Sequence, residues 1–169
     1  MTDEPLLESD PTPDKATAAE HPPLADRIAQ LVQQQPYAVL CTQGQGQPYG
    51  SLVALAVTDD LTSAVFATPR STRKYRLLTG CDHVALVIDS RSSSSADMMN
   101  IEAVTATGRA ALVTTGLELE YWSDLLTRRH HQLASFVNSP TTAVFRVDIL
   151  RYFHVTHFQE VRQWIPSRG

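Results

Sequence analysis

Four cations lie within seven positions of the stretch ATPRSTRKYRLL, residues 67–78. They are Arg70, Arg73, Lys74 and Arg76. The pattern predicts a strand that ends near residue 68 and a helix over 71–79, with Ser71 as its N-cap. Arg73 and Lys74 then fall in the first turn, where each opposes the positive end of the helix dipole at a cost of about 0.3–1 kcal/mol. A bound anion reverses the sign of that interaction, so the spacing points to anion binding.

An anion at this helix terminus meets several donors at once. These are the free backbone N–H groups, the hydroxyls of Ser71 and Thr72, the Arg73 guanidinium and the Lys74 ammonium. A charge run by itself is usually a solvated surface, and that explanation stays open here. The combination of strand, turn, hydroxyls and misplaced cations favours phosphate. No Gly-rich loop precedes the helix, so we expect a phosphate monoester rather than a pyrophosphate.

The other candidate motifs do not predict a catalytic or metal site. The GQG stretch joins two predicted strands, and the third glycine of a dinucleotide fingerprint would fall at Tyr49. His154 and His157 are three residues apart in a predicted strand, which places their rings on opposite faces and argues against a shared metal ion. We expect structural roles for them and for Cys41 and Cys81. Any reactive chemistry is therefore expected to come from a bound cofactor.

Length and charge predict one domain behind an acidic tail. The 169 residues suffice for a single core, and the formal net charge is −4. Residues 1–23 are rich in proline and acidic side chains, so we expect a disordered tail, with one domain over 24–169. The nearly neutral remainder argues against nucleic-acid binding. The sequence contains no apolar run of membrane-spanning length and no secretory signal pattern at its start, which favours the cytoplasm and no membrane partner.

Hydrophobic periodicity predicts a mainly β domain with flanking helices. Six β-rich stretches follow one another by short turns, and Gly108 marks a bulge in the fifth. The predicted strands are 37–42, 49–57, 62–68, 82–89, 101–115 and 142–158. The predicted helices are 24–35, 71–79 and 117–136. This order favours a closed antiparallel barrel over alternating βαβ units.

The chain resembles the pyridoxamine 5′-phosphate oxidase-related flavoproteins, the FMN-binding split-barrel superfamily. The resemblance is carried by a strand of the LCT-x-G kind, a strand of the P-x-x-S-x-V kind, a strand ending FAT, then TRKYRLL and VAL-x-I. Downstream, EAVTATGRAALV and RYFHVTHFQEVRQW are also similar. The resemblance covers about residues 25–164 and is most specific over residues 66–88. It implies a six-stranded antiparallel split β-barrel of Greek-key type, a homodimer, and FMN in the cleft between subunits.

The resemblance also implies roles for individual residues. Thr72, Arg73 and Lys74, next to Ser71, are implied to contact the FMN phosphate. Residues 51–53 and Thr68 are implied to line the ribityl chain or the flavin ring. Loop 90–100 and the region near Trp164 are implied to come from the second subunit. The cofactor-binding set is then Ser51, Leu52, Val53, Thr68, Ser71, Thr72, Arg73, Lys74, Asn100 and Trp164. No catalytic residue and no metal site is assigned.

The chain departs from the true oxidases at its C-terminal end. VRQWIPSRG contains Arg162 and Arg168 but no histidine between them, so vitamin B6 oxidation is not expected. The leading hypothesis is an FMN-dependent oxidoreductase that acts on an unidentified small molecule. The alternatives are a non-catalytic flavin- or haem-binding carrier or sensor, a deazaflavin enzyme, and a split-barrel dimer without cofactor. The histidines that keep the haem hypothesis open are His130, His131, His154 and His157.

Overall fold

The computed structural model describes residues 23–91, 98–157 and 160–167. Nearly all of the predicted tail, 1–23, and most of the serine-rich loop 90–95 lie outside the described residues, so their disorder stays a prediction. The strands are β1 (Tyr37–Gly44), β2 (Gln47–Ala54), β3 (Ala56–Val57), β4 (Ser63–Pro69), β5 (His83–Asp89), β6 (Ala103–Val113), β7 (Thr142–Thr156) and β8 (Glu160–Trp164). The helices are α1 (Leu24–Gln34), α2 (Arg73–Gly80), α3 (Gly116–Arg129) and α4 (Ala134–Val137), with 3₁₀ turns η1 (Met98–Asn100) and η2 (His131–Leu133).

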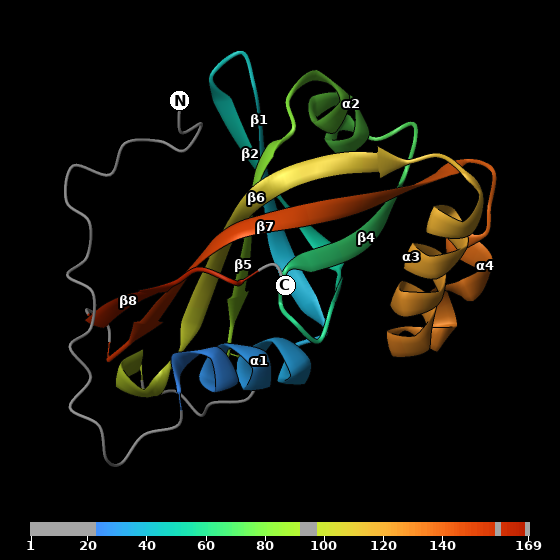
Figure 1. Cartoon of the computed structure of the whole chain (residues 1–169). Coiled ribbons are helices and arrows are strands. Elements are labelled where there is room, and N and C mark those ends of the chain that lie inside the picture. The colour runs from blue at the N-terminus through green and yellow to red at the C-terminus, as the bar shows by residue number, and fades with distance from the viewer. Residues whose placement is uncertain (1–22, 92–97, 158–159, 168–169) are drawn as a thin grey trace.

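The strands form one curled antiparallel sheet, which confirms the mainly β split-barrel class. Its order is β2-β1-β5-β6-β7-β4-β3, and β8 pairs with β7. Figure 1 shows the long strands β6 and β7 crossing the molecule, with α1 at one end of the sheet and α2 towards the other. The strand count differs from six. Leu55 separates β2 from β3, and the short, largely polar strand β8 has too little apolar alternation to be predicted.

The two irregular points of the sheet follow from glycine. The β1–β2 hairpin turns through Gln45 and Gly46, whose φ values are 53° and 78°, the left-handed region that two-residue hairpins require. The predicted bulge is confirmed, because the β6–β7 register shifts between Thr107 and Gly108. A Cβ at Gly108 would lie 2.4 Å from the carbonyl oxygen of Asp148, so only glycine allows the two strands to approach here.

The inner face of the sheet encloses the main core. Phe66 and Phe145 stack with their ring centroids 5.6 Å apart, and α1 contributes Ile28, Leu31 and Val32 to the same cluster. Along the first half of β7 the alternation predicted from the sequence is confirmed, since the apolar positions are buried and Arg146 and Asp148 are only half-buried. Within the described residues, no helix has both the length and the apolar character needed to cross a bilayer.

Helices α3 and α4 cover half of the outer face. Trp122 and Leu126 of α3 pack with outward residues of β4, β6 and β7 in a second apolar cluster. The prediction of one helix over 117–136 is wrong. The helix ends at His130, whose buried ring lies 3.0 Å from the carbonyl oxygen of Leu55 and so fixes the chain away from helical geometry. Leu117 near the start of α3 is 84 % exposed, and Tyr121 is also exposed.

The other half of the outer face has no helix packed on it in the described part of the chain. One row of paired residues crosses it from strand to strand, and we call these residues the outer row. The outer row is Leu52, Val39, Val87, Thr105, Phe153 and Gln163. These side chains are half-buried or exposed, and Leu52 is 67 % exposed. An uncovered, largely apolar sheet face of this kind is typical of an interaction surface.

A network of ionisable side chains around one buried histidine lies at the end of the sheet next to α1. The His154 side chain is fully buried, and its Nε2 lies 3.6 Å from an oxygen of Glu102. The other oxygen of Glu102 accepts a hydrogen bond from Arg27 of α1. Burial is the main cause that lowers the pKa of His154 below its ordinary value of 6.5; the negative charge of Glu102 opposes this shift, and the positive charge of Arg27 adds to it. The imidazole is therefore neutral in the folded protein at pH 7.

This network predicts acid-labile stability. The unfolded chain protonates His154 near pH 6.5, whereas the folded protein does so only at lower pH, so stability falls as the pH drops below about 6.5. One such proton contributes a slope of up to about 1.4 kcal/mol per pH unit. Urea unfolding between pH 7.5 and pH 5 should show a shallower loss of stability in His154→Leu than in the wild type. His157→Leu, which removes an exposed imidazole, is the matched control, and equal slopes in all three proteins would refute the assignment.

Candidate functional site

The candidate site begins where β4 turns into α2. Thr72, not Ser71, is the N-cap: its hydroxyl oxygen accepts a hydrogen bond from the Tyr75 N–H at 3.2 Å and lies 3.0 Å from the Thr68 hydroxyl. The backbone N–H of Thr72 bonds to the carbonyl of Pro69, which leaves Ser71 exposed within the turn. The N-cap is therefore one residue later than predicted, and the helix starts at Arg73. Arg73 and Lys74 are its first two residues, so both still oppose the dipole.

Neither cation of the first turn has an acidic partner in the described part of the chain. The Arg73 guanidinium carbon lies 5.3 Å from the centre of the Tyr49 ring. The Lys74 ammonium donates a hydrogen bond to the carbonyl oxygen of Leu52 at 3.3 Å. Partial burial lowers the pKa of Lys74, because the charged form has lost part of its hydration. No opposite charge compensates these two cations, so an oxyanion placed beside them would form strong charge-assisted hydrogen bonds with both.

Strand β2 supplies the second wall of the site. It is the last strand on its side of the sheet, so the backbone groups on its free edge pair with no other strand of residues 23–91, 98–157 and 160–167. The backbone carbonyl of Leu52, in β2, accepts the hydrogen bond from Lys74 of α2. The Ser51 hydroxyl is buried and has no hydrogen-bond partner among the described residues. A buried unpaired hydroxyl costs free energy, and a polar ligand at the strand edge would remove that cost. Val53 is buried in the core.

The four cations of the original stretch do not act together. Arg73 and Lys74 face β2, whereas the Arg70 guanidinium donates to the Tyr75 hydroxyl at 3.4 Å and lines a cavity on the other side. Arg76 lines a separate hollow next to the β1–β2 hairpin. The candidate anion site therefore contains two of these cations, not four. We call Thr72, Arg73, Lys74 and Ser51 the α2 cluster.

Asn100 and Trp164 are not brought to the α2 cluster within one chain. Asn100 ends η1, which follows the loop after β5. Trp164 is in β8, and its ring packs on Tyr152 with centroids 5.7 Å apart. Figure 1 shows β8 and α2 at opposite ends of the sheet. The sequence-based assignment of both residues to a second subunit stays a prediction.

Sequence reasoning did not assign Tyr49 to the site. This side chain lies under Arg73 and on the same face of β2 as Ser51, two residues away. The sequence did contain a signal for Tyr49, because alternate residues of a strand lie on the same face. If Ser51 faces a ligand, Tyr49 faces the same side.

The sequence model of the pyridoxamine 5′-phosphate oxidase family matches residues 24–156, from α1 to the end of β7. The chain belongs to this family. The match leaves out β8, so Trp164 lies beyond the part that defines membership. No curated protein matches the chain in sequence.

Solved structures with the same fold have low sequence identity to this family member. A heme binding protein from Mycobacterium smegmatis has a TM-score of 0.78 at 16 % identity, over 88 % of this chain and 60 % of its own. Campylobacter jejuni ChuZ has a TM-score of 0.71 at 8 % identity, over 83 % of this chain and 58 % of its own. The chain thus spans about three fifths of these two proteins. General Stress Protein 26 from Bacillus anthracis has a TM-score of 0.57 at 13 % identity, over 84 % and 98 % of the two chains.

Proposed function

We propose that this member of the family binds FMN through the α2 cluster and uses it for oxidation–reduction of a small molecule. The supporting observation is the uncompensated pair of cations on the first turn of α2 beside the buried, unpaired hydroxyl of Ser51. In this proposal Arg73 and Lys74 hold the terminal phosphate, assisted by the first N–H groups of α2. The exposed Ser71 hydroxyl lies in the adjoining turn and is available as a further donor.

In this proposal the residues along the free edge of β2 would hold the rest of the flavin nucleotide. The Ser51 hydroxyl suits the ribityl chain, and the exposed Leu52 side chain provides apolar surface for the ring. Thr68 is buried with its hydroxyl bonded to Thr72, so we propose that it positions Thr72 rather than lining the ribityl chain. Bound flavin supplies hydride or electron transfer, which no cluster of this chain's own side chains is proposed to supply. The protein's tasks are to anchor the phosphate, orient the ring and exclude water from it.

A second copy of the chain completes the proposed site. The outer row lies on the uncovered half of the outer face and ends at Leu52. The backbone carbonyl of Leu52 accepts a hydrogen bond from Lys74, so the outer row adjoins the α2 cluster. A homodimer formed on this face would bury the outer row and bring a partner surface against the α2 cluster. Loop 90–100, with Asn100, and the region near Trp164 are the segments we propose to come from that second copy. This arrangement explains why the α2 cluster is partly open in a single chain.

Haem binding is the second candidate function. It is favoured by the fold shared with the heme binding protein from M. smegmatis. His130 and His154 are buried in the protein, so neither offers an accessible ligand. His83 and Cys41 instead line a cavity of about 390 Å³ on the outer face. Burial raises the pKa of the Cys41 thiol, which makes His83 the better iron ligand of the two.

The absorbance spectrum of the purified protein separates the two functions. We expect the visible absorption bands of a bound flavin, and release of FMN into the supernatant on denaturation. A Soret band after addition of haem, lost in His83→Ala, would instead support the haem alternative. A colourless protein that takes up neither FMN nor haem would refute both. Reduction of bound FMN by nicotinamide donors then tests turnover against a carrier role.

A further inference from the structure

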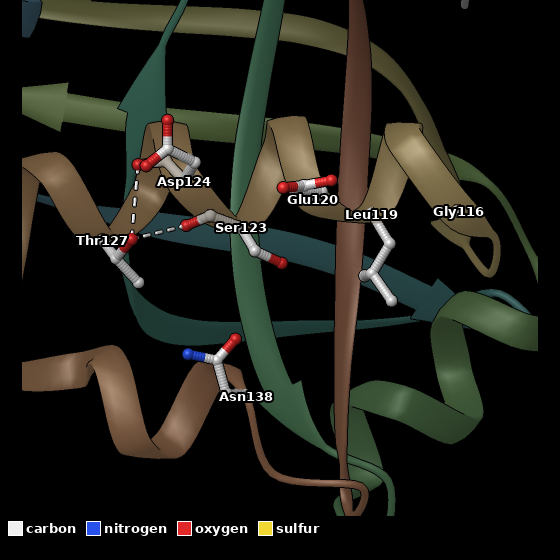
Figure 2. A pocket seen from close by; sticks show the side chains of 7 residues that line it. All are labelled: Gly116, Leu119, Glu120, Ser123, Asp124, Thr127 and Asn138. Carbon is white, nitrogen blue, oxygen red and sulfur yellow. Dashed lines mark hydrogen bonds between the residues drawn. The ribbon is translucent and has the colours of Figure 1, made fainter.

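Two adjoining cavities form a groove on the side of the molecule away from β2. The first, of about 410 Å³, lies between α3 and the end of α4 (Figure 2). The second, of about 350 Å³, extends from it to the end of β6 and the start of β7. They share Leu119, Ser123 and Asn138, so they are continuous. We call this continuous space the α3–α4 groove.

The groove is polar where two helices would normally pack through apolar side chains. Figure 2 shows Ser123 and Thr127 of α3 facing the Asn138 amide across the gap. Thr127 donates to the carbonyl of Ser123 at 2.9 Å, and the Asn138 amide nitrogen donates to the carbonyl of Ala134 at 2.9 Å. The Ser123 hydroxyl and the Asn138 amide oxygen stay available to a ligand. Polar side chains at a helix–helix gap weaken packing, which suits a binding groove better than a structural contact.

The floor of the groove is apolar. Leu119 lines both cavities, and the buried side chains of Val113, Val137 and Val144 line the second. A few polar groups above an apolar floor are the usual composition of a small-molecule site.

The ends of the groove carry opposite charges that lack partners in the described part of the chain. Glu120 lines only the first cavity and makes no ion pair within 4.0 Å there, whereas its neighbour Asp124 pairs with Arg128 at 2.8 Å. Arg70 lines only the second cavity, and its guanidinium contacts the Tyr75 hydroxyl and ring but no carboxylate. An unpaired carboxylate and an unpaired guanidinium therefore lie at opposite ends of one groove.

We propose that the α3–α4 groove binds a short zwitterionic ligand of dipeptide size. The ligand's ammonium group pairs with Glu120, its carboxylate with the planar fork of Arg70, and its side chains rest on the valine floor. Ser123 and Asn138 bond to the amide between the two ends. Glu120 and Arg70 each line only one of the two cavities, so the ligand has to extend from one cavity into the other, and we propose a dipeptide rather than a single amino acid. The site is distinct from the α2 cluster and does not depend on FMN.

Calorimetric titration of the full chain with leucyl-alanine tests the site. We expect saturable 1:1 binding with a Kd of about 1 mM or lower. Arg70→Gln and Glu120→Gln should each weaken binding by about tenfold or more, the usual cost of a lost charge-assisted hydrogen bond. Leucyl-alaninamide, which lacks the carboxylate, should bind Arg70→Gln and wild type equally. N-acetyl-leucyl-alanine, which lacks the ammonium group, should likewise not distinguish Glu120→Gln from wild type.

Ser123→Leu, which fills the middle of the groove, should abolish dipeptide binding and leave FMN affinity unchanged. FMN affinity should be measured in all three variants, because the groove and the α2 cluster are separate sites. Loss of dipeptide binding with unchanged FMN affinity concerns the groove alone, whereas absence of FMN binding in the wild type concerns only the proposed function. The proposal is overturned if leucyl-alanine gives no saturable heat up to about 10 mM, or if the variants bind the dipeptide and its two capped forms as the wild type does.

Discussion

Replacing Arg73 and Lys74 together with alanine will weaken FMN binding by about 10²–10⁴-fold, because each cation is proposed to make a charge-assisted hydrogen bond worth about 1.5–3 kcal/mol. Neither side chain has an acidic partner in the described part of the chain, so their charges are available to the phosphate. Quenching of FMN fluorescence on titration with the apoprotein gives the dissociation constants directly.

The same double variant should not destabilise the protein without cofactor. Both cations oppose the dipole of α2, and the relief of about 0.3–1 kcal/mol for each offsets the loss of the Lys74–Leu52 hydrogen bond and the Arg73–Tyr49 contact, so the stability of the apoprotein should change little. Arg76→Ala is the matched control, since Arg76 lies on the same helix but lines the hollow beside the hairpin. FMN affinity should change less than about threefold in this control, within the range of a surface substitution. Equal FMN affinity in the double variant and the wild type would refute the assignment of Arg73 and Lys74 to a phosphate site.

Substitution of Val87 by glutamate will convert the proposed dimer to a monomer and reduce FMN binding with it. Val87 is at the centre of the outer row, paired with Val39 on one side and Thr105 on the other. A dimer on this face would bury one unpaired carboxylate from each copy, at a cost of several kcal/mol for each. Sedimentation equilibrium, with circular dichroism to verify folding, measures the change.

A matched substitution elsewhere tests whether the surface is specific. Leu117 on α3 is an exposed apolar residue outside the outer row, so Leu117→Glu should leave both the dimer and FMN binding intact. Phe153→Glu, in the outer row, should reproduce the effect of Val87→Glu if that variant folds poorly. A wild-type protein that sediments as a monomer, or a Val87→Glu dimer of unchanged affinity, would contradict the proposed interface.

The sequence predicted the elements whose signal is local. Alternation along 142–158 identified β7, and Gly108 identified the bulge, because both depend on residues adjacent in the chain. The end of α3 could not be predicted, because His130 stops the helix by a contact with Leu55, 75 positions away. Strand β8 is held by pairing to β7 rather than by its own composition, and it was missed for that reason.

The candidate site was predictable in its charges but not in its geometry. Misplaced cations at a helix start are visible in the sequence, whereas the direction of each side chain depends on where the helix begins. The shift of the N-cap from Ser71 to Thr72 moved that start, and Arg70 and Arg76 turned to other surfaces. The orphaned hydroxyl of Ser51 and the outer row are tertiary features, so neither could be read from the sequence.

The most direct measurement compares the affinities of the apoprotein for FMN and for riboflavin, which differ only in the terminal phosphate. The proposal predicts that FMN binds at least about 100-fold more tightly than riboflavin, and that most of this ratio disappears when Arg73 and Lys74 are both alanine. Equal affinities for FMN and riboflavin in the wild-type protein would contradict the assignment of the α2 cluster as a phosphate site.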